Sequence, residues 1–196
     1  MKKRFILVAA PPACGKTFVS ELVAKSLGRC TYLDKDDLAP LLRQSFALQN
    51  QPLNMDGEFY LENFRSVEYE TILRIAFSAL RFDDTVILNA PFGKEVRDSD
   101  YIRQLKEKAN AHNADLILIW VSCPTTVCYQ RMKNRNADRD FLKLANWDSY
   151  IKTVNYSAPV ALETEHAVDK LIVFDTTDEQ STQTALSKTL EMMKGA

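Results

Sequence analysis

The stretch APPACGKT, residues 10–17, joins an apolar run to an amphipathic one, and it decides how the chain folds. The run before it, residues 5–10, is continuously apolar, as expected for a strand buried on both faces of a parallel sheet. The run after it, residues 16–27, has the periodicity of an amphipathic helix. A glycine-containing turn between such a strand and such a helix directs backbone N–H groups at an anion. We therefore expect a phosphate-binding loop here.

Individual positions of this loop match the Walker A pattern, except that Ala10 replaces its first glycine. Gly15 allows close approach of a phosphate, because it has no Cβ. Lys16 supplies a positive charge to the β- and γ-phosphates, and the Thr17 hydroxyl can coordinate Mg²⁺. A strand-to-helix turn that contains Gly-Lys-Thr by chance is the alternative, and the flanking strand and helix argue against it. The predicted nucleotide-binding residues are Pro12, Ala13, Cys14, Gly15, Lys16, Thr17 and Phe18.

Strand-like and helical runs alternate along all 196 residues. Such alternation predicts an α/β fold of three layers, with a five-stranded parallel sheet between helices. The length favours a single domain, residues 1–196. The helical run 58–81 has one apolar face, made of Tyr60, Phe64, Val67, Thr71, Ile72, Ile75, Ala79 and Phe82. The expected strands are 5–10, 31–33, 85–88, 115–121 and 170–174, and the expected helices are 16–27, 37–47, 58–81, 94–112, 124–133 and 178–193.

Composition excludes several classes of function. The net charge of −1 gives no general attraction to nucleic acid or to an anionic membrane. No segment approaches the roughly 20 apolar residues of a membrane span. Cys14 and Cys30 are isolated, while Cys123 and Cys128 lack a second pair or a nearby histidine. We therefore expect reduced, structural thiols in a cytoplasmic protein that has no membrane partner, and nucleic acid is disfavoured as a partner.

An acidic turn, LDKDDL, follows the second expected strand. The carboxyl ends of parallel strands meet at one edge, so Asp34, Asp36 and Asp37 should face the phosphate-binding loop. A carboxylate there can orient or deprotonate an acceptor hydroxyl, or hold Mg²⁺ through water. The alternative is a helix N-cap formed by Asp36 or Asp37. One cap still leaves one or two carboxylates, so we favour a catalytic role, with Asp36 first and Asp34 second.

The third strand, in VILNAPF, ends at Asn89, where phosphate-handling proteins commonly carry a metal-binding aspartate. An asparagine cannot act as a base. It can still accept a hydrogen bond from a metal-bound water or donate one to a phosphate oxygen. The predicted metal-site residues are Thr17, Asp34 through water, and Asn89 through water.

Three arginines follow the fourth strand. Arg131 and Arg135 lie four residues apart and share a helix face, and Arg139 falls in the charged, exposed segment 133–147. Arginines in a mobile lid would stabilise the charge of a transferring phosphoryl group. The alternative is a solvated helix end that is salt-bridged to Asp138 and Asp140.

The chain resembles small P-loop kinases and AAA-type ATP-binding proteins, through APPACGKT, YLDKDDL, VILNAPF and RMKNRNADRD in that order. It is most similar to the group of chloramphenicol phosphotransferase and zeta-toxin-like kinases, and more distantly to shikimate and adenylate kinases. The resemblance implies a nucleoside-kinase-like sheet with a short helical lid at about 133–147. It also implies ATP, Mg²⁺ and transfer of the γ-phosphate to a hydroxyl of a small molecule. The catalytic residues implied are Lys16, Asp36, Arg131, Arg135 and Arg139, with residues 173–178 near the adenine.

Two other functions stay open. A nucleotide-dependent switch or regulatory ATPase would act through a protein partner, and Asn89 favours this because a missing carboxylate can slow turnover. A polynucleotide 5′-end kinase needs a basic groove with interleaved aromatic side chains, and the near-neutral charge disfavours it.

Overall fold

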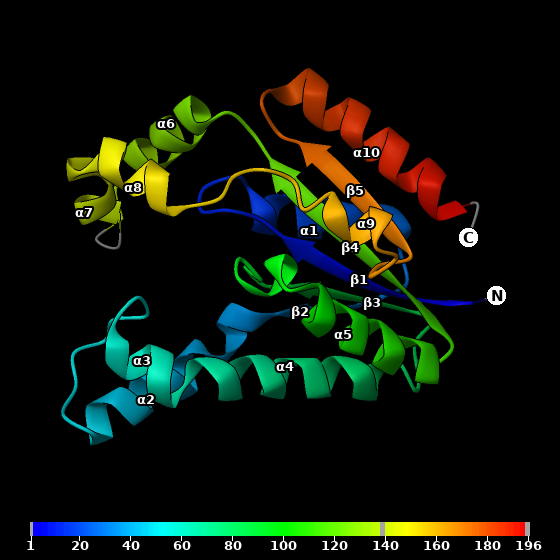
Figure 1. The fold of residues 1–196 in the computed structure, drawn as a ribbon, viewed down its shortest axis with the longest axis horizontal. Coiled ribbons are helices and arrows are strands. Elements are labelled where there is room, and N and C mark those ends of the chain that lie inside the picture. Colours follow the sequence, from blue (N-terminus) through cyan, green and yellow to red (C-terminus); the bar gives the residue numbers. More distant parts are fainter. Residues whose placement is uncertain (1, 138–139, 195–196) are drawn as a thin grey trace.

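The computed structural model describes residues 2–137 and 140–194. In this part of the chain, five strands form one parallel sheet in the spatial order β2-β3-β1-β4-β5, which confirms the predicted α/β fold (Figure 1). Because β1 is central, the loop that follows it lies in the middle of the carboxyl edge. The strands are β1 Lys3–Ala9, β2 Thr31–Asp34, β3 Thr85–Asn89, β4 Ala114–Ser122 and β5 Lys170–Asp175.

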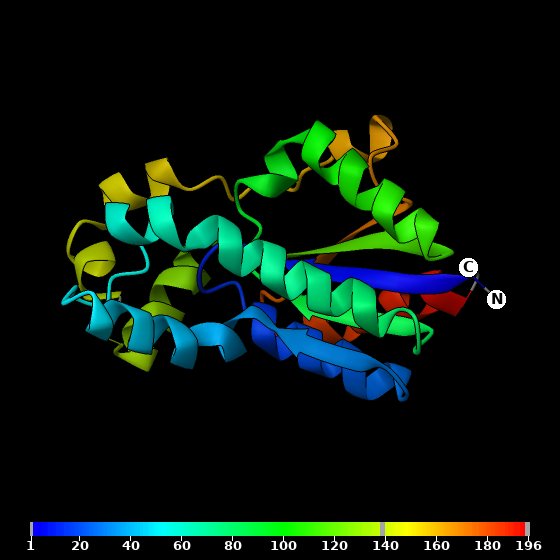
Figure 2. The same cartoon turned by 90° about the horizontal axis from the view of Figure 1, so that it is seen from below.

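Helices cover both faces of the sheet, so the central strands are buried and continuously apolar (Figures 1 and 2). One face packs against α1 (Lys16–Leu27) and α10 (Glu179–Lys194), with Val19, Val23 and Met193 in its core. The other face packs against α4 (Arg65–Ala79) and α5 (Ser99–Ala111), with Ile72 and Leu105 in its core. The result is the expected three-layer arrangement.

Shorter helices extend from the carboxyl edge of the sheet as two groups on opposite sides of the phosphate-binding loop (Figure 1). The acceptor-side group consists of η1 (Lys35–Leu38), α2 (Ala39–Leu48) and α3 (Glu58–Asn63). The lid-side group consists of α6 (Thr125–Arg135), α7 (Phe141–Ala145) and α8 (Trp147–Thr153). An ion pair of 3.2 Å between Lys143 Nζ and Asp56 Oδ2 joins the two groups.

The expected helix 58–81 is two helices, α3 and α4, which are interrupted at Phe64, where the backbone leaves helical geometry (φ −125°). Its predicted apolar face is confirmed at Tyr60 and Ile72, which are buried. It is wrong at Val67, Ile75 and Phe82, which are 57%, 42% and 80% exposed. The face of α4 that is buried carries Glu68, Tyr69, Ile72 and Ala76. Glu68 on this face forms a buried ion pair with Lys35.

Two other segments differ from expectation. The run 94–112 begins with the short helix η2 (Glu95–Arg97), and α5 starts only after Asp98, whose carboxylate caps it by accepting from the N–H groups of Asp100 and Tyr101. The described part of the segment 133–147 contains the end of α6 and all of α7, and most of it is exposed as expected, but Asp140 is buried. A further short helix, α9 (Ala161–Thr164), was not predicted. Across residues 2–137 and 140–194, no helix is long and apolar enough to cross a membrane.

Candidate active site

The phosphate-binding loop between β1 and α1 has the backbone geometry of an anion cradle. Ala13 and Gly15 both have positive φ angles, 65° and 88°, which turn successive N–H groups inward. Gly15 is the N-cap of α1 and has no side chain to satisfy the first N–H groups of that helix. A Cβ added to Gly15 would lie 3.5 Å from Arg131 Nη1 in a strained backbone conformation. The loop thus offers N–H donors and a helix N-terminus to phosphate.

Asn89 is the centre of a hydrogen-bonded cluster at the end of β3. Its amide oxygen accepts from Lys16 Nζ, and its amide nitrogen donates to Asp34 Oδ2 and, over 3.3 Å, to Thr17 Oγ1. The register of the sheet produces this arrangement, because Asp34 on β2 pairs directly with Asn89. The structure therefore brings together Lys16 and all of the predicted metal-site residues. Their hydroxyl, carboxylate and amide oxygens are the hard ligands that Mg²⁺ prefers.

In the acidic turn, the residue that caps the following helix differs from the sequence-based expectation. Asp34 is the cap of η1, since its Oδ1 accepts from the N–H of Asp36 over 2.9 Å. The expected cap, Asp36 or Asp37, is wrong, because the capping residue precedes the short helix η1 rather than α2. The Asp36 side chain is 68% exposed and lies 3.5 Å from Lys35 Nζ. Its described contacts are therefore on the acceptor side and not with Asn89.

Arg131 and Arg135 have different hydrogen-bonding partners. Arg131 donates from Nη1 to Thr176 Oγ1 (3.1 Å) and from Nη2 to the Thr176 carbonyl (2.5 Å), against the phosphate-binding loop. Arg135 forms a two-point ion pair with the buried carboxylate of Asp140, including an Nη2–Oδ1 contact of 2.7 Å. Arg139 lies outside the described residues. Arg131 is thus placed beside the loop, whereas Arg135 is held within the lid-side group.

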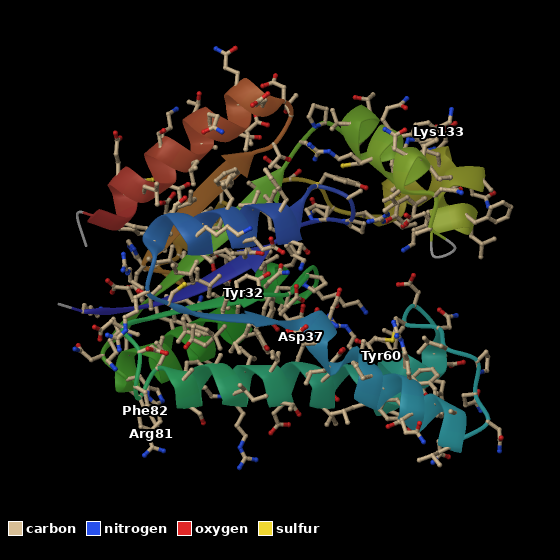
Figure 3. The ribbon with its side chains drawn as sticks, turned by 180° about the vertical axis from the view of Figure 1, so that it is seen from behind. Tyr32, Asp37, Tyr60, Arg81, Phe82 and Lys133 are labelled. Atoms are coloured by element: carbon tan, nitrogen blue, oxygen red, sulfur yellow. The ribbon has the colours of Figure 1, made fainter. Side chains whose placement is uncertain are left out.

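A buried charged pair, which the sequence did not reveal, underlies the acceptor-side group. Lys35 Nζ lies 2.9 Å from Glu68 Oε1, and the two side chains are 6% and 2% exposed. Tyr60 Oη donates to Glu68 Oε2, and burial together with this hydrogen bond raises the pKa of Tyr60. Tyr60 and Phe92 are both buried core residues. Figure 3 shows Tyr60 and Asp37 on the acceptor side and Lys133 on the lid side.

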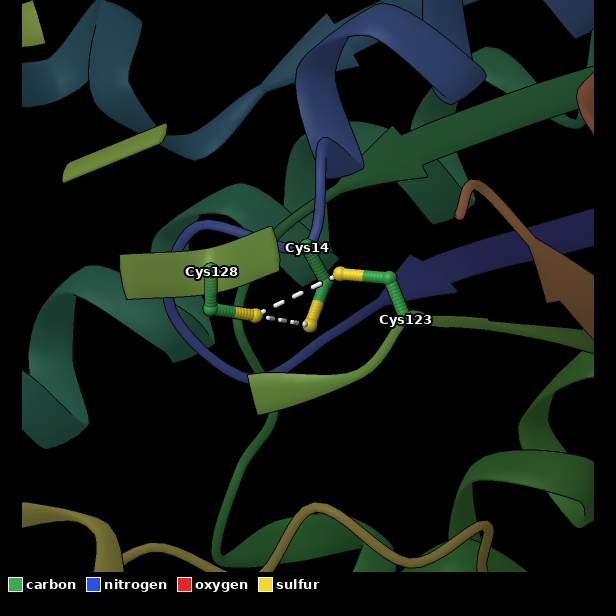
Figure 4. Close-up of side chains that lie close together, drawn as sticks. All are labelled: Cys14, Cys123 and Cys128. Atoms are coloured by element: carbon green, nitrogen blue, oxygen red, sulfur yellow. Dashed lines mark hydrogen bonds between the residues drawn. The ribbon is translucent and has the colours of Figure 1, made fainter. Parts of the chain in front are cut away.

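Three of the cysteines gather behind the phosphate-binding loop (Figure 4). The Sγ atom of Cys128 lies 3.5 Å from that of Cys14 and 3.3 Å from that of Cys123. The expectation that Cys14 is isolated is wrong, because it lies in one cluster with Cys123 and Cys128. The pairing of β1 with β4 explains the cluster, because residues that follow neighbouring parallel strands meet at the same edge.

A cavity of about 690 Å³ lies between α4 and α5, away from this site. Arg65, Tyr69, Glu95 and His112 are among its lining residues, and Lys16, Thr17, Asp34 and Asn89 are not. The loop and the Asn89 cluster therefore remain the candidate active site.

The sheet order and the anion-binding loop after the central strand define a P-loop fold of the kinase type. A family model described as "AAA domain" matches residues 6–156, and the chain belongs to this family. The match ends before β5 and α10, which complete the sheet and its covering layer.

Solved structures share the whole fold. A provisionally assigned kinase from Chloroflexus aurantiacus J-10-fl has a TM-score of 0.60 at 17% identity, with 100% of both chains covered. Kti12 from Chaetomium thermophilum, solved with ADP-AlF3, has a TM-score of 0.58 at 17% identity, covering 95% of this chain and 97% of that one. Shikimate kinase from Bacteroides thetaiotaomicron has a TM-score of 0.55 at 12% identity, covering 97% and 98%. No curated protein matches the chain by sequence.

Replacing Asn89 with aspartate should make the protein depend on Mg²⁺ for stability. A carboxylate at this buried position would face Asp34 at hydrogen-bonding distance, and two like charges disfavour each other there. We expect a loss of about 1–3 kcal/mol in the unfolding free energy without metal, and recovery when Mg²⁺ is added. Thermal denaturation with and without Mg²⁺ measures both effects. Asn110→Asp, on the exposed surface of α5, is the matched control. A variant as stable as wild type in the absence of Mg²⁺ would contradict the described cluster.

Proposed function

We propose that the protein is an ATP-dependent phosphotransferase that moves the γ-phosphate of ATP-Mg to a hydroxyl of a small molecule. The observation that carries the proposal is the Asn89 cluster, which joins Lys16, Thr17 and Asp34 directly in front of a phosphate-binding loop. Phosphoryl transfer requires this combination of N–H donors, a fixed cation and oxygen ligands more than it requires covalent chemistry by the protein.

The loop would bind the phosphates of ATP through its backbone N–H groups, and Lys16 would turn from Asn89 toward the β- and γ-phosphates. Thr17, with Asp34 and Asn89 acting through water, would hold Mg²⁺, which supplies positive charge against the developing negative charge of the phosphoryl group. Because Asp34 is fixed twice, by Asn89 and by the N–H of Asp36, its free lone pairs point in a defined direction. We infer that this preorganisation replaces the carboxylate that β3 lacks.

Acceptor activation is assigned to Asp36, which is exposed on the acceptor side and beside Lys35. A carboxylate there can accept the proton of an acceptor hydroxyl or align that hydroxyl for in-line attack. Arg131, which packs against Gly15, is the arginine best placed to stabilise the transferring group. Arg135 would first have to leave Asp140, so we expect it to order the lid-side group instead. A role for Arg139 stays a prediction.

Closure of the site is supported by the Lys143–Asp56 ion pair, which links the two groups of helices across the open end of the molecule. Such a contact would exclude water from the phosphoryl group, which favours transfer to the acceptor over hydrolysis. The family match and the small-molecule kinase among the similar structures support the same class of reaction.

ATP consumption measured with pools of hydroxyl-bearing metabolites tests the proposal. We expect at least one pool of sugars, polyols or hydroxy acids to raise ATP consumption well above the basal hydrolysis, with a phosphorylated product detectable by mass spectrometry. Consumption that no pool changes, and that a protein fraction raises, would overturn the proposal in favour of a regulatory ATPase. Asn89 and the similarity to Kti12 are the observations that favour this second function.

Asp36→Asn should separate acceptor activation from nucleotide binding. Loss of the base is expected to lower kcat by roughly 10²–10⁴, while the affinity for ATP changes little because Asp36 is outside the Asn89 cluster. Asp37→Asn, the next exposed residue of the same short helix, is the matched control. Steady-state kinetics and nucleotide titration measure the two quantities. If ATP affinity falls as much as kcat, Asp36 serves the metal or the fold and not the acceptor.

A further inference from the structure

The three clustered cysteines come from the phosphate-binding loop and from two segments beside it. Cys14 lies in the loop itself, Cys123 follows β4, and Cys128 is on α6 (Figure 4). Cys14 and Cys128 are 1% and 0% exposed, whereas Cys123 is partly exposed. A solute that reaches the cluster therefore meets Cys123 first.

The surroundings of Cys123 favour its thiolate form. Its sulfur lies 3.3 Å from Cys128 Sγ and 3.5 Å from Arg131 Nη1. Hydrogen bonding by Cys128 and by Cys14, together with the guanidinium of Arg131, lowers the pKa of the Cys123 thiol. Hydrogen bonding to the same sulfur raises the pKa of Cys14 and Cys128, which remain protonated. An accessible thiolate beside a protonated neighbouring thiol is the arrangement of a redox-sensitive cysteine.

We propose that Cys123 is a peroxide-reactive thiol, that its oxidised form joins Cys128 in a disulfide, and that this modification weakens nucleotide binding at the adjacent loop. The thiol chemistry is independent of the proposed function, and the effect on nucleotide binding rests on it.

The reaction takes place in two steps. The Cys123 sulfur attacks one oxygen of a hydroperoxide, the O–O bond breaks, and the leaving oxygen departs as water or an alcohol after it takes up a proton. Cys123 is then a sulfenic acid. The Cys128 sulfur attacks the Cys123 sulfur, the S–S bond forms, the S–O bond breaks, and water leaves with the thiol proton. Two thiols lose two electrons in total, and the peroxide gains them.

The disulfide would act on the loop through Arg131 and Thr176. Arg131 contacts both Cys123 and Thr176, and Thr176 Oγ1 donates over 2.7 Å to the Cys14 carbonyl within the loop. Shortening the Cys123–Cys128 contact from 3.3 Å to the bond length of about 2.05 Å shifts the end of β4 against α6. It also removes the negative charge that faces Arg131. Both changes disturb the hydrogen bonds that hold the loop in its anion-binding geometry.

Peptide mapping tests the modification without any assay of activity. Trypsin cleavage after Lys and Arg places Cys123 and Cys128 on one peptide, residues 109–131, and leaves Cys14 and Cys30 on two others, residues 5–16 and 30–35. After treatment with hydrogen peroxide and alkylation, the 109–131 peptide should carry no alkyl group and lack the mass of two hydrogen atoms. A peptide that stays alkylated at both cysteines, or a cross-link to the Cys14 peptide, would overturn the proposed pairing.

Three variants assign the roles. Cys128→Ser should leave a sulfenic acid on Cys123 that a dimedone probe captures, and Cys123→Ser should yield neither that adduct nor a disulfide. Cys30→Ser, which is remote from the cluster, is the matched control and should behave as wild type. In the reduced wild type, iodoacetamide at pH 6 should label Cys123 faster than Cys30, whose pKa is raised by burial. Equal or slower labelling of Cys123 would contradict its thiolate character.

A metal site is the rival use of these three sulfurs, which lie within 4.8 Å of one another. Stoichiometric binding of added Zn²⁺ that protects all three thiols from alkylation, and that Cys30→Ser retains but Cys128→Ser loses, would overturn the redox proposal. We expect Zn²⁺ to give no such protection.

Nucleotide titration tests the consequence for the loop. The peroxide-treated protein should bind a fluorescent ATP analogue roughly tenfold more weakly, and dithiothreitol should restore the affinity. Unchanged affinity in protein that carries the mapped disulfide would overturn the regulatory effect. If the reduced protein binds no nucleotide, the proposed function fails, while the peptide map still reports on the thiol chemistry.

Discussion

Replacing Lys16 with alanine is expected to lower kcat by roughly 10²–10³, the size of effect seen when a preorganised electrostatic group is removed from an active site. Lys16 is the first residue of α1, directly after the phosphate-binding loop, and its ammonium donates to the Asn89 amide oxygen. Without it, Thr17 and the loop N–H groups remain, but no fixed cation of this helix faces the β- and γ-phosphates. Acceptor-dependent ATP consumption and nucleotide titration measure the loss.

Lys25→Ala is the matched control, because Lys25 lies on the same helix and pairs with Glu21 at the exposed surface. An exposed pair of this kind contributes little, so kinetics and stability should both stay near wild type. Thermal denaturation of both variants separates a functional loss from a folding defect. Turnover by the Lys16 variant that equals wild type would end the phosphotransferase proposal.

Lys35→Met should be the most destabilising single change in the acceptor-side group. It leaves the Glu68 carboxylate, which is 2% exposed, without its cation, and among the described side chains only Tyr60 still donates to it. Breaking a buried pair by removing one partner costs about 3–5 kcal/mol. Denaturant unfolding, with the midpoint and slope compared between variants, measures the change in the free energy of unfolding.

The double variant Lys35→Met/Glu68→Leu should recover much of this loss, because apolar side chains of similar volume replace a buried pair at little cost. Lys25→Met, which removes one partner of the exposed pair, should stay within about 0.5 kcal/mol of wild type. A Lys35 variant no less stable than the Lys25 variant would mean that the pair is solvated and not buried.

The fold could be predicted because each strand is short, apolar and bounded by clear helical runs. The predicted bounds 16–27 of α1 agree with the structure, and each strand lies within two residues of its expected ends. The meeting of Thr17, Asp34 and Asn89 could also be predicted, because parallel strands bring their carboxyl ends to one edge. These inferences depend on the hydrophobic periodicity of the sequence and on the general geometry of parallel sheets.

Other features depend on tertiary packing that periodicity does not report. Charge is normally a sign of exposure, so the burial of Glu68 against Lys35 was not expected, and the buried face of α4 is shifted from the predicted one. The break at Phe64 has no glycine or proline to mark it. The cysteine cluster needs the spatial order of the strands, since Cys14 and Cys128 are separated by 114 positions.

The hydrogen bond from Thr176 to the carbonyl of Cys14 joins residues 162 positions apart. The phosphate-binding loop is synthesised before its anchor, which belongs to the segment that follows β5. A nascent chain that ends at residue 156, where the family match stops, would have its phosphate-binding loop on an edge that still lacks both Thr176 and β5. The loop therefore gains this anchor only after the segment that follows β5 has been synthesised, so a chain that ends at residue 156 should bind nucleotide more weakly.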